Sequence, residues 1–218
     1  MSSSHRAVAI DGPAASGKST VAKRLADSLG MVMVNSGAMY RAVTWQVLKN
    51  GASPQDVDAV IKSLNEMEIT CGMEEGRSTI AINGQLLDEE LRSEAVNNAV
   101  SHVAAVPQVR DRLVQLQRDY LATSDVVMEG RDIGSVVFKD TPYKLYIDAS
   151  EEVRRARRAA DGEADAVAAR DAQDSQRKTA PLKISDGAIV IDSSELQIDE
   201  VVEAARQALL KLGWQDPS

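Results

Sequence analysis

The sequence predicts an α/β fold in which a central parallel sheet is flanked by helices, and two observations carry this prediction. Short apolar runs, typical of strands buried on both faces, alternate along the chain with amphipathic helical patterns. The first run, residues 7–10, leads into a glycine-rich loop at residues 12–20 and then into a helix. Strand, loop, helix and strand in this order are the opening of a parallel α/β sheet.

The loop at residues 12–20 has the pattern Gly-x-x-x-x-Gly-Lys-Ser, completed by Gly17, Lys18 and Ser19. Its glycines let backbone N–H groups turn towards phosphate oxygens, and the helix that follows adds the positive end of its dipole. Lys18 is expected to reach the β- and γ-phosphates, and the Ser19 hydroxyl is expected to bind Mg²⁺. We therefore predict a site for a nucleoside triphosphate, formed by Gly12, Pro13, Ala14, Ala15, Ser16, Gly17, Lys18, Ser19 and Thr20.

Length and composition narrow the class of protein. The 218 residues suffice for one domain, residues 1–218, with a sizeable core. The net charge of −8 argues against a general nucleic-acid binder, and no apolar run approaches membrane-spanning length. The single cysteine, Cys71, excludes an intramolecular disulfide, and the N-terminus lacks a signal-peptide pattern. We expect a cytoplasmic monomer that binds neither nucleic acid nor membrane.

The first half of the chain continues the α/β pattern after the loop. An amphipathic helix ends at Gly30, and residues 31–34 form an apolar run typical of a buried strand. Ser36 and its neighbours then break the strand at its carboxyl end, where parallel sheets place their ligands. Residues 39–48 are predicted to be helical, and Ser53 is predicted to cap a helix that runs towards residue 67.

The pattern changes between residues 69 and 87. Residues 69–73 and 80–82 alternate between apolar and polar side chains, with Glu75-Gly76 between them. Asn83-Gly84 is a second turn signal. We predict a small antiparallel sheet inserted into the parallel fold.

The second half returns to strands and helices. Apolar runs predict strands at residues 126–128, 144–147 and 188–191. Helical patterns cover residues 92–106, 107–120 and 198–212. Asp148 and Asp192 follow two of the strands, and one of them could serve as a Mg²⁺ partner, but Asp148 with Glu151 also fits a capping box, which we prefer.

Phosphoryl transfer requires positive charge around the phosphates, so the positions of the arginines are informative. Arg41 and Arg131 each follow the carboxyl end of a predicted strand, where a parallel sheet gathers ligand contacts. Arg110 borders the apolar stripe of its helix and is expected to approach the interior. Arg112 falls on the polar face of the same helix, where we expect a solvated charge.

The densest basic cluster lies in a helix that offers little apolar surface for docking. This composition predicts a short mobile lid at residues 154–169 that brings Arg157 or Arg158 to the transferring phosphoryl group. Arg170, Asp174 and Arg177 follow on one helical face. They are either a surface ion-pair ladder or a group that faces the ligand, and their spacing does not distinguish the two.

The chain resembles bacterial cytidylate (CMP/dCMP) kinases through motifs that occur in that family's order and cover nearly the whole sequence. They are Asp11 with the loop at 12–20, Asn-Ser-Gly-Ala-Met-Tyr-Arg at 35–41, Val100-Ser101-x-Val103-Ala104 with Pro107-x-Val109-Arg110, Glu-Gly-Arg-Asp-Ile-Gly at 129–134, and the residues from Arg170 to Arg177 followed by Ala180-Pro181-Leu182.

The resemblance implies a P-loop kinase fold with a monophosphate-binding insertion at residues 62–106 and the lid at 154–169. It implies transfer of the γ-phosphoryl group of MgATP to CMP or dCMP, which yields ADP and CDP or dCDP. It places Ser36, Ser101, Arg110 and Asp132 around the pyrimidine, Arg41 and Arg131 at the monophosphate, and Arg170, Asp174 and Arg177 near the ribose and phosphate.

Chemistry favours cytosine, because its amine can donate to Asp132 and its ring nitrogen and carbonyl can accept from an arginine. Uracil would instead set a carbonyl oxygen against Asp132. The acceptor is a phosphate oxygen with a pKa of about 6 and needs no strong general base, so we expect His5 and His102 to be unimportant. The alternatives are a uridylate or thymidylate kinase, a P-loop ATPase without an acceptor, and a binding-only module.

Overall fold

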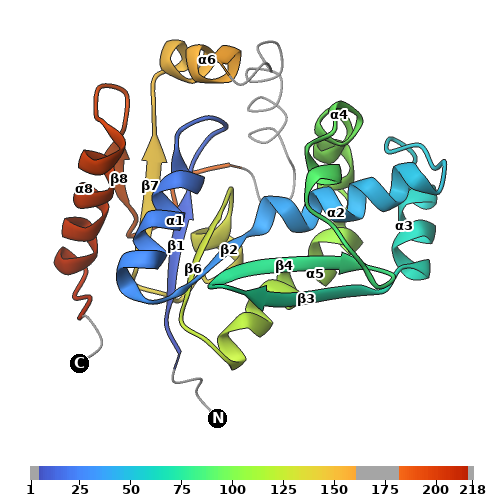
Figure 1. Ribbon diagram of the computed structural model, residues 1–218, viewed down its shortest axis with the longest axis horizontal. Coiled ribbons are helices and arrows are strands. Elements are labelled where there is room, and N and C mark those ends of the chain that lie inside the picture. The colour runs from blue at the N-terminus through green and yellow to red at the C-terminus, as the bar shows by residue number, and fades with distance from the viewer. Residues whose placement is uncertain (1–4, 161–181, 216–218) are drawn as a thin grey trace.

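The computed structural model describes residues 5–160 and 182–215, and its strands form one continuous sheet with helices on both faces (Figure 1). The strands are β1 (Ala7–Asp11), β2 (Val32–Asn35), β3 (Ile69–Glu74), β4 (Arg77–Ile82), β5 (Gln85–Leu86), β6 (Val126–Gly130), β7 (Lys144–Asp148) and β8 (Ile189–Asp192). The helices are α1 (Lys18–Leu29), α2 (Ser36–Lys49), α3 (Val57–Glu66), α4 (Glu94–Val103), α5 (Pro107–Asp119), α6 (Glu151–Ala160) and α8 (Ile198–Lys211). Single helical turns lie at η1 (Glu89–Arg92), η2 (Tyr120–Ala122) and η3 (Ile133–Val137).

The parallel part of the sheet confirms the predicted α/β class. Its strands lie in the order β2-β6-β1-β7-β8, so the loop after β1 starts from the middle of the sheet. Each neighbouring pair in this series is parallel. The carboxyl ends of the five strands therefore lie along one edge, which is the upper edge in Figure 1. The chain segments that leave this edge are the natural place for a ligand site.

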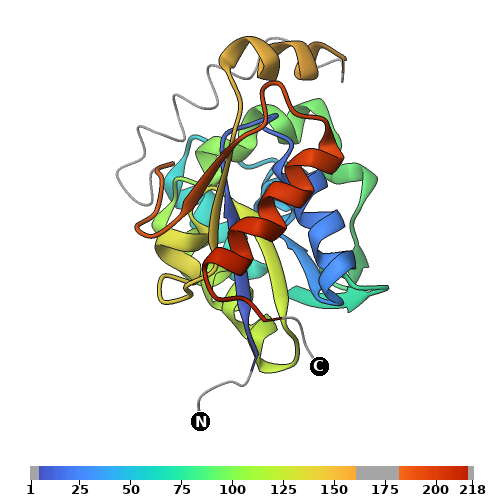
Figure 2. The same cartoon turned by 90° about the vertical axis from the view of Figure 1, so that its left-hand side faces the viewer.

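The two faces of the parallel sheet carry separate apolar cores. In β1, Val8 and Ile10 pack towards α1 and α8, whereas Ala7 and Ala9 pack towards α5 and η3. All four side chains are at most 4% exposed. Figure 2 shows α8 crossing the sheet on the first of these faces. Burial on both faces explains why these strands read as continuous apolar runs.

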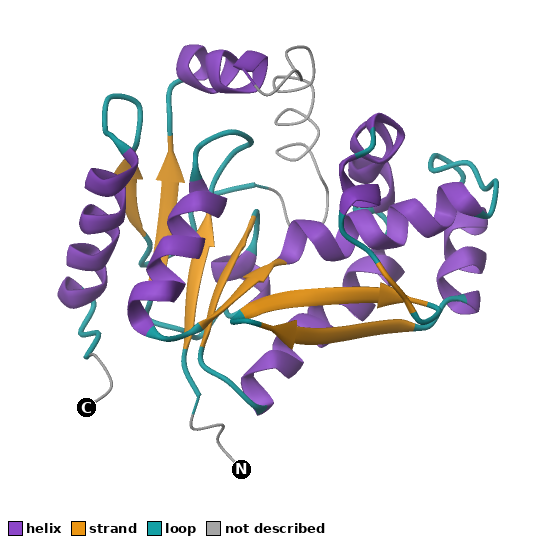
Figure 3. Ribbon diagram, viewed as in Figure 1, coloured by secondary structure: helices purple, strands orange, loops and turns teal. Residues whose placement is uncertain are grey.

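The predicted antiparallel hairpins are confirmed, and both turns use the residues that the sequence indicated. Glu75 and Gly76 have φ of 48° and 73°, and Asn83 and Gly84 have φ of 50° and 78°. These left-handed conformations are those of two-residue hairpin turns. The hairpins do not form a separate sheet, however, because β4 pairs in parallel with β2 at Met33 and extends the main sheet (Figure 3).

The half of the molecule beyond β2 has its own apolar core. Its buried side chains come from α2, α3, the hairpins, α4 and α5. Helices α2 and α5 lie outside residues 62–106, so the packing unit is larger than the insertion that the sequence indicated. The limits of that insertion as a functional region stay a prediction.

Two predicted helix starts are wrong, because other side chains cap the helices. Helix α2 starts at Ser36 instead of residue 39, since the Asn35 side chain accepts a hydrogen bond from the backbone N–H of Ala38 (3.0 Å). Helix α3 starts at Val57 and not after Ser53, since the Asp56 carboxylate accepts from two backbone N–H groups at 3.1 Å. In both cases the capping oxygen satisfies N–H groups that have no partner within the helix.

Two expectations about polar side chains are also wrong. Arg112 is not solvated: its guanidinium donates to the carbonyl oxygens of Leu64 (2.7 Å) and Met67 (3.0 Å) at the end of α3. Asp148 does not cap α6. The Ser150 hydroxyl accepts from the N–H of Val153 in the first turn of this helix, whereas the Asp148 carboxylate accepts from the N–H of Ala149 (2.9 Å). The position of Arg112 follows from the end of α3, because the last carbonyl groups of a helix have no donor within it and need one from elsewhere.

Helix α6 lies apart from the sheet, above its upper edge in Figure 1. None of its ten residues, all of which the structure describes, is buried, as the scarcity of apolar side chains predicted. Residues 161–169 of the predicted lid lie outside the described residues. Among the helices that the structure describes, none has the length and apolar character required to cross a membrane.

Candidate active site

The loop between β1 and α1 approaches neighbouring backbone closely, and two of its glycines account for its path. A Cβ atom at residue 12 would lie 2.1 Å from the carbonyl oxygen of Ile147 on β7. Gly17 has φ of 86° and directly precedes the first residue of α1. Lys18 is 9% exposed, and its Nζ donates to the carbonyl oxygen of Pro13 (3.0 Å). The residues predicted to bind ATP thus lie in the loop after β1 and in the first turn of α1, at the upper edge of the sheet, where a helix N-terminus favours phosphate.

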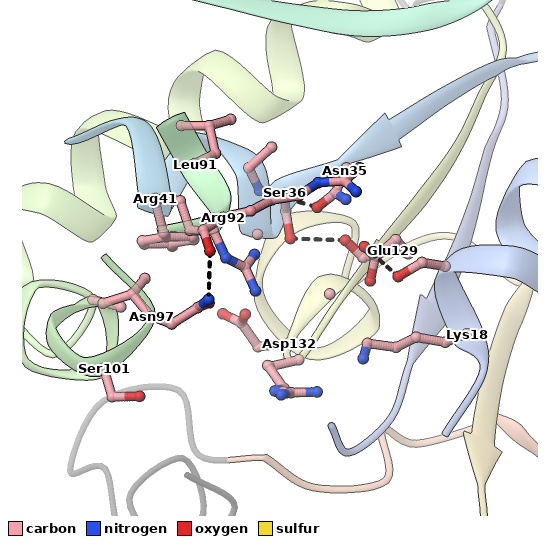
Figure 4. A pocket seen from close by; sticks show the side chains of 18 of the residues that line it. Lys18, Asn35, Ser36, Arg41, Leu91, Arg92, Asn97, Ser101, Glu129 and Asp132 are labelled. Carbon is pink, nitrogen blue, oxygen red and sulfur yellow. Dashed lines mark hydrogen bonds between the residues drawn. The ribbon is translucent and has the colours of Figure 1, made fainter. Parts of the chain in front are cut away.

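Glu129 is a site residue that the sequence analysis did not assign. Its side chain is buried near the end of β6, and its carboxylate accepts a hydrogen bond from the Ser19 hydroxyl (3.0 Å, Figure 4). Asp148 and Asp192, the two acidic residues considered as Mg²⁺ partners, instead accept hydrogen bonds within their own turns, from the N–H groups of Ala149 (2.9 Å) and Ser194 (2.9 Å). The acidic neighbour of Ser19 is therefore Glu129.

A cavity of about 430 Å³ opens beside the phosphate loop. It is lined by residues from α1, the β2–α2 junction, η1, α4, α5, the end of β6 and α6. Among them are these residues that the sequence singled out: Lys18, Ser19, Ser36, Arg41, Ser101, Arg110, Arg131, Asp132 and Arg158. In Figure 4 Lys18 lies on one side of the cavity and Ser101 on the other, with Asp132 between them. Side chains from distant parts of the chain therefore meet in one cavity.

A buried ion pair forms part of the lining of this cavity. The guanidinium of Arg110, on α5, is paired with the carboxylate of Asp132, which follows β6. The two residues are 3% and 5% exposed, and the Arg110 guanidinium also lies 5.6 Å from the centre of the Tyr40 ring. Mutual compensation of charge is the condition under which two such groups stay buried. The pair thus places one donor group and one acceptor group side by side in the lining of the cavity.

Two serine side chains line the cavity, and one of them holds the neighbouring backbone. The Ser36 hydroxyl donates to the carbonyl oxygen of Glu129 (2.7 Å), which ties the start of α2 to the end of β6. A Cβ atom at residue 130 would lie 2.5 Å from that same hydroxyl oxygen, so Gly130 leaves the room that Ser36 occupies. Ser101, on α4, is 7% exposed and lines the opposite wall.

Arg131 links the cavity to the phosphate loop. Its Nη1 donates to the carbonyl oxygen of Gly12 across 2.6 Å. Arg41 lines the cavity from α2, and its Nη1 lies near Gly37, where a Cβ atom would come within 2.8 Å of it. Arg131 is therefore held against the phosphate loop, whereas Arg41 lies close to the start of α2.

The two candidate lid arginines occupy different places. Arg158 lines the cavity. Arg157 instead donates to the hydroxyl (3.1 Å) and the carbonyl oxygen (2.8 Å) of Ser193, which follows β8, and more distantly to the carbonyl oxygen of Ala15 (3.4 Å). Arg157 thus ties α6 to the outer side of the phosphate loop, and Arg158 faces the ligand cavity. Arg170, Asp174 and Arg177 lie outside the described residues.

The cavity has further lining residues to which the sequence assigned no individual role, although Asn35 and Tyr40 belong to the motif at residues 35–41. They are Asn35, Tyr40, Asp88, Leu91, Arg92 and Asn97. Asp88 and Arg92 belong to η1 and its cap, a short turn without the periodicity that reveals longer elements. The Asn97 side chain donates to the carbonyl oxygen of Arg92 (3.0 Å, Figure 4), which joins η1 to α4.

Asp11, the last residue of β1, is a buried carboxyl group beneath the cavity. It is 1% exposed, and its two oxygens accept from the backbone N–H groups of Ile133 (2.7 Å) and Gly134 (2.8 Å). Burial raises the pKa of the Asp11 carboxyl to about 7, and the nearby Asp132 adds to the rise. The two N–H donors and Lys18 oppose it. Within the described residues, no cluster of three or more His, Cys, Asp or Glu side chains suited to a metal ion was found.

Comparison with known proteins points to one family. The family model described as cytidylate kinase matches residues 8–211. A protein named cytidylate kinase from Clostridium botulinum (strain Langeland) is 44% identical over 207 residues, covering 90% of this chain and 94% of that protein. Proteins of the same name from Alkaliphilus metalliredigens and Nocardia farcinica are each 42% identical over 90% of this chain, covering 92% and 90% of their own length.

Solved structures that align with the chain are more distant. A shikimate kinase from Acinetobacter baumannii in complex with shikimate covers 98% of this chain and 97% of its own, at 12% identity and a TM-score of 0.49. We draw nothing on function from so remote a likeness.

Proposed function

The chain belongs to the cytidylate kinase family, an ATP-dependent family that phosphorylates CMP or dCMP, and we propose that the cavity beside the phosphate loop is where this transfer occurs. The γ-phosphoryl group of ATP passes to the phosphate of CMP or dCMP, and the products are ADP and CDP or dCDP. One observation supports this location above all others. Lys18 of the phosphate loop and the buried pair of Arg110 and Asp132 line the same cavity.

The buried ion pair is proposed to recognise cytosine. Asp132 would accept a hydrogen bond from the exocyclic amine, and Arg110 would donate to the ring nitrogen or the carbonyl. Uracil presents a carbonyl where cytosine has the amine, and that carbonyl would face a carboxylate. Ser36 and Ser101, which line the cavity on either side, are proposed to complete the contacts to the pyrimidine.

The arginines and Lys18 are proposed to hold the phosphates and to stabilise the charge that develops during transfer. Arg41 and Arg131 would bind the monophosphate, Lys18 and the loop at 12–20 would bind the triphosphate, and Arg158 would reach the transferring group from α6. Arg170, Asp174 and Arg177 are proposed to contact the ribose and phosphate. Transfer of this kind depends on positioning and positive charge more than on covalent chemistry. The attacking phosphate has a second pKa of about 6, so it is largely deprotonated at neutral pH and requires no strong base.

Magnesium is proposed as the metal partner of ATP, held by Ser19 and Glu129. A hydroxyl and a carboxylate fit the preference of Mg²⁺ for a few protein oxygens alongside the oxygens of nucleotide phosphates. When bound, the ion would neutralise charge on the β- and γ-phosphates. Glu129 holds the Ser19 hydroxyl through a 3.0 Å hydrogen bond, and this contact orients both oxygens towards one place.

Three finer points stay predictions. The segment at residues 154–169 is expected to close over bound nucleotides, and this is supported by the absence of buried residues in α6, which the structure describes in full. Residues 62–106 are expected to be the inserted monophosphate-binding region. We also expect the protein to act as a monomer in the cytoplasm.

A panel of acceptors tests the proposal. Initial rates of ADP formation with MgATP would be measured for CMP, dCMP, UMP and dTMP, and without any acceptor. We expect CMP and dCMP to exceed UMP and dTMP by at least about tenfold in kcat/KM, because a mismatched polar group is costly in a buried site. Higher turnover of UMP or dTMP would contradict the proposed base recognition. Rapid ATP hydrolysis that ignores CMP would indicate an ATPase.

A further inference from the structure

The turn that follows β6 carries both Arg131 and Asp132, and it is tied to the start of the phosphate loop by three hydrogen bonds. The Asp11 carboxylate accepts from the N–H groups of Ile133 (2.7 Å) and Gly134 (2.8 Å). In the opposite direction, Arg131 donates to the carbonyl oxygen of Gly12 (2.6 Å). The last residue of β1, Asp11, and the first residue of the phosphate loop, Gly12, therefore hold the turn that is proposed to bind CMP.

The turn depends on these bonds because it lies beyond the sheet. The β1–β6 ladder ends where Asp11 pairs with Gly130, so residues 131–134 receive no support from strand pairing. The backbone of Asp11 itself is fixed on both sides, since it also pairs with Tyr146 of β7. Ile133 and Gly134 are also the first residues of η3, so loss of the Asp11 carboxylate would leave their N–H groups without this acceptor and would shift the turn at its junction with η3. The backbone at the base of the phosphate loop would stay paired.

Close packing makes the contact specific. A Cβ atom at residue 134 would lie 2.6 Å from the hydroxyl oxygen of Ser185 and 3.3 Å from Oδ2 of Asp11. Asp11 and Ser185 are 1% and 5% exposed. Gly134 therefore allows its N–H to approach the carboxylate, and a larger residue at this position would push the turn outwards.

We propose that Asp11 is a positioning residue for nucleotide selection, whose carboxylate fixes the turn of residues 131–134 so that Asp132 and Arg131 meet the base and phosphate of CMP. This inference rests on the proposed function, because it assigns base recognition to Asp132. It is separate from a role in phosphate binding. The negative charge of Asp11 would by itself weaken the binding of phosphate groups. Its hydrogen bonds to the turn would instead strengthen the binding of CMP, because they hold Asp132 and Arg131 in place.

Replacement of Asp11 by Asn separates these effects. The amide has nearly the same shape but only one acceptor oxygen, so one of the two N–H groups would face an NH₂ group. We expect the KM for CMP to rise about tenfold or more, and the preference in kcat/KM for CMP over UMP to fall by a similar factor. The KM for ATP should change less than about twofold, because the loop base stays paired on both sides.

The matched control is Asp148→Asn. Asp148 ends the neighbouring strand β7 and accepts from the N–H of Ala149 (2.9 Å), and it does not line the cavity. We expect this variant to keep both KM values and the preference for CMP. An Asp11→Asn variant that keeps the wild-type preference for CMP would overturn the inference, as would tighter CMP binding, which would mean that charge is the main effect. An equal loss for ATP and CMP would also overturn it, because it would indicate a general structural role.

A second variant keeps the test decisive if Asp11→Asn folds poorly. Gly134→Ala displaces the same turn and leaves the Asp11 carboxylate intact, and we expect the same selective loss for CMP. Circular dichroism and the melting temperature would establish that the variant compared is folded. If the wild-type protein itself fails to prefer CMP, the proposed function fails; if the wild type prefers CMP and a folded Gly134→Ala variant does so equally, the role of Asp11 fails.

Discussion

Arg110 and Asp132 form a buried ion pair that joins helix α5 to the turn after β6, with 4% and 7% of the two side chains exposed. The two residues are 22 positions apart in the sequence, and both line the cavity that Lys18 also lines. Each charge is compensated by the other in the interior, and the pair is proposed to recognise cytosine. Removal of one partner should therefore affect both stability and recognition.

Asp132→Ala should abolish discrimination between pyrimidines. We expect the preference in kcat/KM for CMP over UMP to fall about 100-fold or more, because the acceptor for the cytosine amine is lost. The KM for ATP should stay within about twofold. Urea unfolding should show a loss of about 3–5 kcal/mol, since Arg110 is left as an unpaired buried charge. An unchanged ratio of CMP to UMP turnover would count against base recognition by Asp132.

Glu129→Gln should raise the Mg²⁺ requirement. The amide oxygen can still accept from Ser19, but the negative charge near the metal is gone, so we expect the midpoint of activation to rise about tenfold. The measurement is the initial rate as a function of MgCl₂ at fixed ATP and CMP, with Asp148→Asn as the control. An identical Mg²⁺ midpoint in wild type and variant would refute the assignment.

Alanine substitutions at Arg157 and Arg158 should have different kinetic effects. Arg158→Ala removes a cavity-lining charge, and we expect kcat to fall about 100-fold or more. Arg157→Ala loses the contacts to Ser193 and Ala15, and we expect mainly a higher KM for ATP. Steady-state kinetics with each substrate varied in turn distinguishes these effects. The reverse pattern would mean that the two arginines exchange places when nucleotides bind.

Arg6→Ala should destabilise the fold without changing catalysis. Arg6 donates to the Asp125 carboxylate and to the carbonyl oxygen of Gln215, and its guanidinium lies 4.0 Å from the centre of the Trp214 ring. It thus ties the start of β1 to the segment after α8. We expect a loss of about 1–2 kcal/mol in the free energy of unfolding, in proportion to a partly exposed ion pair and one cation–π contact. Loss of activity at 25 °C in the folded variant would contradict a purely structural role.

The stability of the protein should depend on the charge of Asp11. The pKa of this carboxyl is about 7 in the folded protein and 3.8 in the unfolded chain, so between these values the folded state binds more protons. Stability contributed by this group must therefore fall as pH rises from about 4 to 7. Relative to Asp11→Asn, which does not titrate, the wild type should gain stability as pH is lowered through this window. Urea unfolding of both proteins at several pH values measures the difference, and a gain in the opposite direction would show that the folded carboxyl titrates below its unfolded value.

The phosphate loop and the positions of the strands along the chain could be predicted because both are encoded locally. The loop spacing, the apolar runs of β1 and β6 and the turn residues Asn83 and Gly84 each act over a few neighbouring positions. The family resemblance then indicated Arg110 and Asp132 as partners in base recognition, and the structure brings these two residues together.

The rest depends on contacts between distant segments. Glu129 meets Ser19 only because β6 lies beside β1 in a particular register, and no local pattern marks a buried glutamate at the end of a strand. The prediction that Arg112 is solvated is wrong because the periodicity of its own helix says nothing about the end of α3. The Arg112 guanidinium caps the carbonyl groups there. Asp56 rather than Ser53 starts α3 because capping is settled by hydrogen-bond geometry, which the sequence leaves open between neighbouring candidates.

The most direct measurement of the central claim uses adenosine and cytidine joined through their 5′ positions by five phosphates. Such a compound would occupy both nucleotide sites only if they open into one cavity. We expect it to bind with one molecule per chain and to inhibit competitively against both ATP and CMP, with affinity lost in Lys18→Ala and in Asp132→Ala. Inhibition that is competitive with only one of the two substrates would contradict a shared cavity.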